Sequence, residues 1–136
     1  MLAVIATVAA VVVVQASVGL THFDATPGPG AAQITVTWGT ETEVGVIAFR
    51  VVRSTQPLVQ TATLIRVMPA VGSGVGGAEY EFVDSSLVAG QRYFYWLYEI
   101  TAAGDVYLIS QAVTAVAPAQ STLARRTYLP LAFRSN

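Results

Sequence analysis

Cysteine and lysine are both absent from this sequence of 136 residues, and histidine occurs once. Without cysteine there is no disulfide bond, no thiolate nucleophile and no cysteine-based zinc site. All seven basic residues are arginine, and eight acidic residues bring the formal net charge to -1. Such a chain has no cationic field that attracts phosphate backbones, so we expect no nucleic-acid partner.

Charge of either sign is scarce. Charged residues make up 11% of the chain and hydrophobic residues 54%, whereas an average soluble domain has about 25% charged residues. The length suits one domain with short appendages. We therefore expect a single core and a surface that is apolar in part, or covered by another segment.

The first 20 residues contain no charged side chain. A transmembrane helix needs about 20 apolar residues, and residues 14–16 offer a weak cleavage site for a signal peptide. A packed, pilin-like stem helix is a third interpretation. The positive flank that usually precedes such segments is missing. We assign residues 1–17 as a helical signal peptide, membrane anchor or stem, confine membrane contact to residues 1–20, and expect an extracellular or cell-envelope location.

The remainder of the chain is patterned as β-strands. Alternating apolar residues predict about seven strands, at residues 20–23, 33–38, 46–53, 61–68, 79–83, the aromatic run within 87–97, and 106–116. The polar stretch at residues 39–45 is typical of a turn, and residues 69–78 are typical of a glycine-rich loop that does not pack. We place one domain at residues 18–117, followed by a tail at residues 118–136 with a possible edge strand.

Three motifs in order, TVTW, FRVVRS and FVDSSLVAGQRYFYWL, resemble a fibronectin type III domain. Trp38 stands where that family has a core tryptophan. Residues 87–93 are similar to its Leu-x-Pro-Gly-x-x-Tyr motif, with Ala89 in place of proline. The resemblance implies an all-β, seven-stranded antiparallel immunoglobulin-like or fibronectin type III sandwich, which we expect to follow the N-terminal hydrophobic, helical segment. It also implies that the Tyr93 hydroxyl bonds back to the preceding turn.

The aromatic run offers a candidate binding surface. Alternation directs Phe94, Trp96 and Tyr98 to the face opposite Tyr93. Tyrosine and tryptophan are enriched at binding hot spots, and flat aromatic rows stack on sugars. Arg50, if its strand lies alongside, adds a hydrogen-bonding fork. We predict that this row binds a protein or a carbohydrate, unless the chain's own tail covers it.

The tail supplies a second apolar set. Its members are Tyr128, Leu129, Leu131 and Phe133. In one interpretation these apolar side chains pack over the aromatic row of the same chain and cover it. Alternatively, the tail is an edge strand donated to another subunit, which gives an assembly of copies of the same chain.

No chemistry is evident from the remaining polar residues. His22, as the lone histidine, does not make a catalytic triad or a histidine-rich metal site by itself. Glu41 and Glu43 lie beside the predicted turn without further oxygen ligands, and we expect them to be solvated. Residues 72–77 lack the lysine of a phosphate-binding loop. We expect no enzyme activity, no catalytic residue, no metal ligand and no cofactor.

These observations favour a non-enzymatic, exported structural or adhesive module that acts at the cell surface through protein-protein contacts. Two alternatives remain at this point. One is a subunit of an extracellular filament, assembled through a pilin-like stem or a donated strand. The other is a carbohydrate-binding module.

Overall fold

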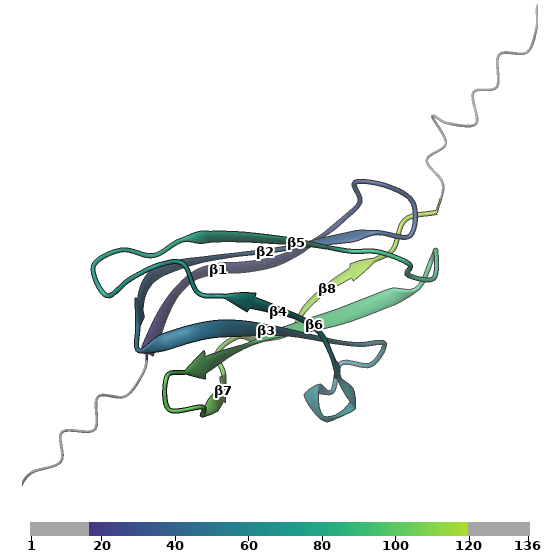
Figure 1. Cartoon of the computed structure of the whole chain (residues 1–136). Helices are drawn as coiled ribbons and strands as arrows, with labels where there is room; N and C mark the ends of the chain where they lie inside the picture. The colour runs from purple at the N-terminus through teal and green to yellow at the C-terminus, as the bar shows by residue number, and fades with distance from the viewer. Residues whose placement is uncertain (1–16, 120–136) are drawn as a thin grey trace, which may run out of the picture.

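The computed structural model describes residues 17–119, which form two antiparallel sheets packed face to face (Figure 1). The first sheet has the order β1-β2-β5, and the second has the order β4-β3-β6-β7, with β8 also paired to β6. The strands are β1 (Ser17–Pro27), β2 (Ile34–Val44), β3 (Val46–Ser54), β4 (Thr63–Pro69), β5 (Glu79–Asp84), β6 (Arg92–Thr101), β7 (Val106–Leu108) and β8 (Val113–Val116); a single 3-10 turn, η1, spans Val59–Thr61.

The core lies between the sheets, where period-two alternation places it. Ile34, Val36 and Trp38 of β2 are fully buried. Trp38 stacks on Tyr80 with ring centroids 4.9 Å apart and planes 8° apart, and it meets the edge of Phe49 at 5.8 Å. The prediction that Trp38 is a core residue is confirmed.

The turn before β6 has the predicted tyrosine corner. The backbone N–H of Val88 donates to the Tyr93 hydroxyl at 2.9 Å, and the N–H of Gln91 donates to the Val88 carbonyl at 3.1 Å. The turn therefore closes with Ala89 in the place of proline. Since Tyr93 is buried in the core, this bond fixes the turn to the interior of the sandwich.

The described chain has eight strands, so the prediction of seven is wrong. The expected last strand at residues 106–116 is divided into β7 and β8, which pair with opposite ends of β6. Between them, the N–H of Leu97 donates to the Ser110 hydroxyl at 2.9 Å, in place of a backbone carbonyl. The backbone ladder is interrupted there because the serine hydroxyl, and not a backbone carbonyl, accepts the hydrogen bond from Leu97.

The predicted turn at residues 39–45 is also wrong, because β2 continues to Val44 and only Gly45 turns the chain into β3. Gly45 has a φ of 67°, a region that glycine adopts without a steric penalty. Thr40 and Glu43 are buried within this strand. They tolerate burial because the Thr40 hydroxyl donates to the Glu43 carboxylate at 2.6 Å.

The glycine-rich loop between β4 and β5 packs against β2, contrary to the prediction. The N–H of Gly72 donates to Glu43 Oε2 at 2.7 Å, and the N–H of Glu43 donates to the Ser73 carbonyl at 2.8 Å. A Cβ atom at Gly77 would collide with the Thr40 carbonyl. The glycines here permit close backbone approach, which is a packing role.

The two ends of the described chain lie at opposite ends of the sandwich (Figure 1). Ser17 pairs with Val44 next to the β2–β3 turn, whereas the Pro118 carbonyl accepts a hydrogen bond from Ala32 at the other end, at 2.8 Å. Residues 17–20 belong to β1, so the predicted helical segment does not include them.

The predictions for residues 1–16 and for the tail lie outside the described residues, and the tail set of Tyr128, Leu129, Leu131 and Phe133 is among them. Within residues 17–119, no helix has the length and apolar character needed to cross a membrane.

Candidate binding surface on the second sheet

Strand register defines the outer face of the second sheet, because paired residues on antiparallel strands point to the same side. Three rows cross this face: Val67, Arg50, Tyr98 and Leu108; Leu64, Val52 and Trp96; and Pro69, Ala48, Ile100 and Val106. Phe94 lies beside Thr114 at the β8 end. The structure thus brings Phe94, Trp96, Tyr98 and Arg50 together on one surface, which we call the outer face.

Trp96 lies at the centre of the outer face and is only 5% exposed. Its ring centroid is 6.5 Å from that of Phe94, with the planes 30° apart. Exposure increases towards the margins, to 52% for Leu64 on β4 and 45% for Leu108 on β7. The predicted row is therefore not an open, flat platform, because its tryptophan is buried. Replacing Trp96 would remove packing as well as surface, so the marginal leucines are the cleaner positions for binding tests.

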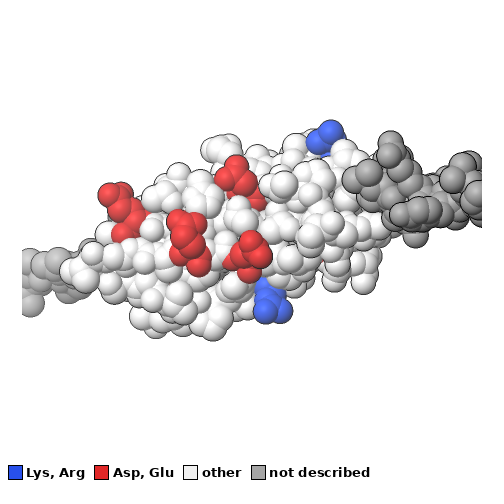
Figure 2. Space-filling model, turned by 90° about the horizontal axis from the view of Figure 1, so that it is seen from above, with Lys and Arg blue, Asp and Glu red and all other residues white. Residues whose placement is uncertain are grey.

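The outer face of the first sheet has the opposite character. Asp24 and Glu81 flank Thr37 in one row across the sheet, and both acids are exposed. Figure 2 looks onto this sheet and shows acidic side chains distributed over it, with basic ones only at its margins. The two outer faces of the sandwich thus differ in polarity and in charge sign.

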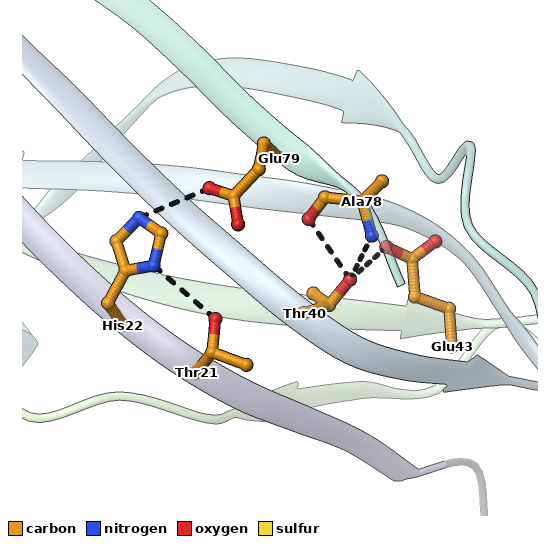
Figure 3. A network of polar contacts seen from close by, with 6 residues as sticks. All are labelled: Thr21, His22, Thr40, Glu43, Ala78 and Glu79. Atoms are coloured by element: carbon orange, nitrogen blue, oxygen red, sulfur yellow. Dashed lines mark hydrogen bonds and ion pairs between the residues drawn. The ribbon is translucent and has the colours of Figure 1, made fainter. Parts of the chain in front are cut away.

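His22 belongs to this acidic side. Its Nε2 atom lies 3.4 Å from Oε2 of Glu79, and its Nδ1 atom lies 3.3 Å from the Thr21 hydroxyl (Figure 3). The interpretation of His22 as a partly exposed first-strand residue agrees with this placement. Among residues 17–119, no group of three or more histidine and acidic side chains is arranged to hold a metal ion.

A buried carboxylate that the sequence did not indicate stabilises the β4–β5 loop. Glu43 accepts hydrogen bonds from the hydroxyls of Thr40 and Tyr80, both at 2.6 Å; Figure 3 shows Thr40 reaching both Glu43 and Ala78. Burial, together with the hydrogen bond to Glu43, raises the pKa of Tyr80 to about 12. The Tyr80 hydroxyl therefore keeps its proton and donates it, and Glu43 is not the solvated acid we predicted.

A second polar cluster links the two sheets. Arg53 Nη1 on β3 lies 2.8 Å and 2.7 Å from the two carboxylate oxygens of Asp84 on β5, and the Tyr95 hydroxyl on β6 donates to Asp84 at 2.9 Å. The Arg53 guanidinium also lies over the Tyr93 ring, 5.3 Å from its centroid. Burial raises the pKa of Tyr95, and the Asp84 carboxylate adds to the effect. These groups satisfy one another, so we assign them a structural role.

Glu99 is a third buried acid, and one of its oxygens lacks a partner. It is 3% exposed, and Oε2 has no hydrogen-bond partner among the described residues. Burial raises the pKa of the Glu99 carboxyl, and a hydrogen bond from the Val18 backbone acts in the opposite direction. Folding therefore shifts this carboxyl towards its protonated form relative to the unfolded chain.

We predict that Glu99→Gln stabilises the protein at neutral pH. The pKa of this carboxyl is higher in the folded state than its ordinary value of 4.5. Its contribution to stability is therefore complete below pH 4.5 and is lost as the pH rises through the folded-state pKa. Thermal melts between about pH 4 and about pH 8 should show a gain for the variant that grows with pH. Glu81→Gln, at an exposed position, is the control. A gain that does not change with pH, or an equal gain in the control, would contradict the prediction.

The two packed sheets and the tyrosine corner define a β-sandwich with the fibronectin type III-like fold. Among solved structures, a Fn3-like protein from Clostridium thermocellum is similar, with a TM-score of 0.54 and 18% identity, over 78% of this chain and 97% of that one. The pectate lyase Pel3 from Pectobacterium carotovorum has a TM-score of 0.56 and 16% identity, over 71% of this chain and 27% of the lyase. A beta-1,2-glucanase from Parabacteroides distasonis has a TM-score of 0.52 and 18% identity, over 78% of this chain and 14% of that chain.

At these identities the likeness concerns the fold. No protein-family model matches the sequence, and no curated protein sequence matches it either.

Proposed function

We propose that the protein is a non-enzymatic structural or adhesive module that acts through protein-protein contacts at the outer face. The observation that supports this is the composition of that face, in which apolar and aromatic side chains surround Arg50. Large apolar patches on soluble proteins usually mark sites of interaction. The acidic outer face of the first sheet has no comparable apolar set, so we assign the contact to the second sheet.

An extracellular or cell-envelope location is part of this proposal. It rests on the uncharged, apolar composition of residues 1–16. Assembly into a filament is a variant of the same proposal, in which the partner is another copy joined through the terminal segments.

Carbohydrate binding is the second candidate. It is supported by the similar folds in a pectate lyase and a beta-1,2-glucanase, where the matched region is 27% and 14% of the chain. The burial of Trp96 argues against it, since a sugar stacks on an accessible ring face. Phe94 and Tyr98 are half-buried and present less ring surface than a flat platform would. We therefore place protein contact first.

Site-specific crosslinking tests the proposal. A photoreactive phenylalanine analogue is placed at Leu108 on the outer face or, as the matched control, at Glu81 on the first sheet, in the full chain on cells that produce it. We expect protein adducts from position 108 and few from position 81. Added wild-type chain should compete, whereas a Leu64→Glu, Val67→Glu chain should not. These positions are half exposed, so melting temperatures should change little.

Equal adducts from both positions would contradict the proposal, and so would equal competition by wild type and variant. If Phe94→Ala instead abolished retention on a polysaccharide column without affecting the adducts, the carbohydrate candidate would take precedence.

A further inference from the structure

Resting on the proposed function, we infer that the partner presents a carboxylate flanked by apolar side chains, and that Arg50 is the group that binds it. Arg50 lies in the row between Val67 and Tyr98, one strand from Trp96. It is half-buried, and its Nε atom is buried without a hydrogen-bond partner among the described residues. Because Nε is inaccessible while the side chain as a whole is half-buried, a partner's carboxylate would be bound by the other guanidinium N–H groups, through charge-assisted hydrogen bonds.

The other arginines of residues 17–119 each have a partner within the fold. Arg53 bonds to Asp84, Arg66 lies over the Phe82 ring, and Arg92 donates to Thr114. Arg50 is thus the arginine of the described part that has a buried guanidinium N–H without an acceptor. Arginine binds carboxylates through two parallel hydrogen bonds, which gives direction as well as affinity.

The charges around Arg50 indicate which kind of partner fits. The three rows of the outer face contain no acidic residue, and Arg92 adds a second positive charge at the beginning of β6. A purely apolar partner would bury the guanidinium without an acceptor, and a basic partner would be repelled. The outer face therefore discriminates in favour of apolar segments that contain aspartate or glutamate.

The chain itself does not offer such a segment to this face. Residues 120–136 contain three arginines and no aspartate or glutamate, so their side chains bring Arg50 no carboxylate. A symmetric pairing of two outer faces would oppose arginines to apolar groups or to one another. The acidic outer face of the first sheet of another copy would supply carboxylates, but that face has no apolar set to flank them. The chemistry therefore points to a different protein as the occupant.

A pair of small probes tests the inference on the full chain. The probes are 3-phenylpropionate and its neutral analogue 3-phenylpropanol, titrated into isotope-labelled protein while the Arg50 Nε–H and Trp96 indole signals are followed by NMR. We expect both probes to shift Trp96 and only the carboxylate to shift Arg50, with about tenfold tighter binding of the carboxylate. Arg50→Gln should abolish that preference. Arg92→Gln, at the margin of the same face, should retain it.

Equal affinity for the two probes would overturn the inference, as would loss of the preference in Arg92→Gln alone. It would also be overturned if Leu131→Asp with Phe133→Asp moved the Arg50 signal without probe, since the tail would then be the occupant. Movement of that signal with protein concentration would identify a second copy and overturn it too. If outer-face crosslinks form but no carboxylate preference appears, the inference fails while the proposed function stands. The proposed function fails if the crosslinks do not form.

Discussion

Asp84→Ala is expected to destabilise the fold by about 3–5 kcal/mol, the usual effect of removing one partner of a buried ion pair. The substitution leaves the Arg53 guanidinium without its carboxylate and the Tyr95 hydroxyl without its acceptor. Because domains of this size are stable by about 5–15 kcal/mol, we expect a measurable fraction of the variant to be unfolded at 37 °C. Urea denaturation followed by circular dichroism measures the difference.

The matched control for Asp84→Ala is Asp24→Ala, an exposed acid on the first sheet, for which we expect a change within about 0.5 kcal/mol. The double variant Arg53→Met, Asp84→Leu removes both charges, and it should recover part of the lost stability. If Asp84→Ala were no more harmful than the control, the cluster would not be what holds the sheets together at this end.

Trp38→Ala is expected to cost about 3–5 kcal/mol through lost burial and the cavity left behind. Trp38 is fully buried, and it contacts Tyr80 face to face and Phe49 edge to face. Its indole nitrogen has no hydrogen-bond partner among the described residues. Trp38→Phe keeps an aromatic ring and removes that unsatisfied nitrogen, so it should cost much less. Equilibrium unfolding of both variants measures the difference.

The two tryptophans of the sequence make this comparison informative. In Trp38→Phe the remaining fluorescence comes from Trp96 on the outer face, and in Trp96→Phe it comes from the core. Unfolding should shift both signals, whereas binding at the outer face should shift only the signal of Trp96. If Trp96→Ala proved more damaging than Trp38→Ala, the assignment of the core to the space between the sheets would be wrong.

Strand alternation predicted the parts of the fold that depend on local pattern. Ile34, Val36 and Trp38 alternate with threonines, and the turn before Tyr93 has its own motif, so both were predictable from neighbouring residues. Alternation also placed Phe94 and Trp96 on the side opposite the core. It does not reveal how exposed each side chain on that side is, which is why the burial of Trp96 was not predicted.

The buried acids were beyond the reach of the sequence. Glu43 looks like part of a polar turn, and its burial depends on Tyr80 and Gly72, which lie 37 and 29 residues away along the chain. Asp84 and its partner Arg53 are likewise far apart along the chain, by 31 residues. Such pairs form only once the sheets are assembled, so a local pattern contains no signal for them. The division of the last strand has a similar origin, since it depends on one serine hydroxyl meeting the backbone of β6.

The placement of the chain ends has a mechanical consequence. Ser17 begins β1 at one end of the sandwich and Ala119 follows β8 at the other. A force pulling these ends apart would run along the strands, so the hydrogen bonds of β1 to β2 and of β8 to β6 would be sheared together rather than unzipped in turn. That geometry suits a domain that has to hold while tension passes through it.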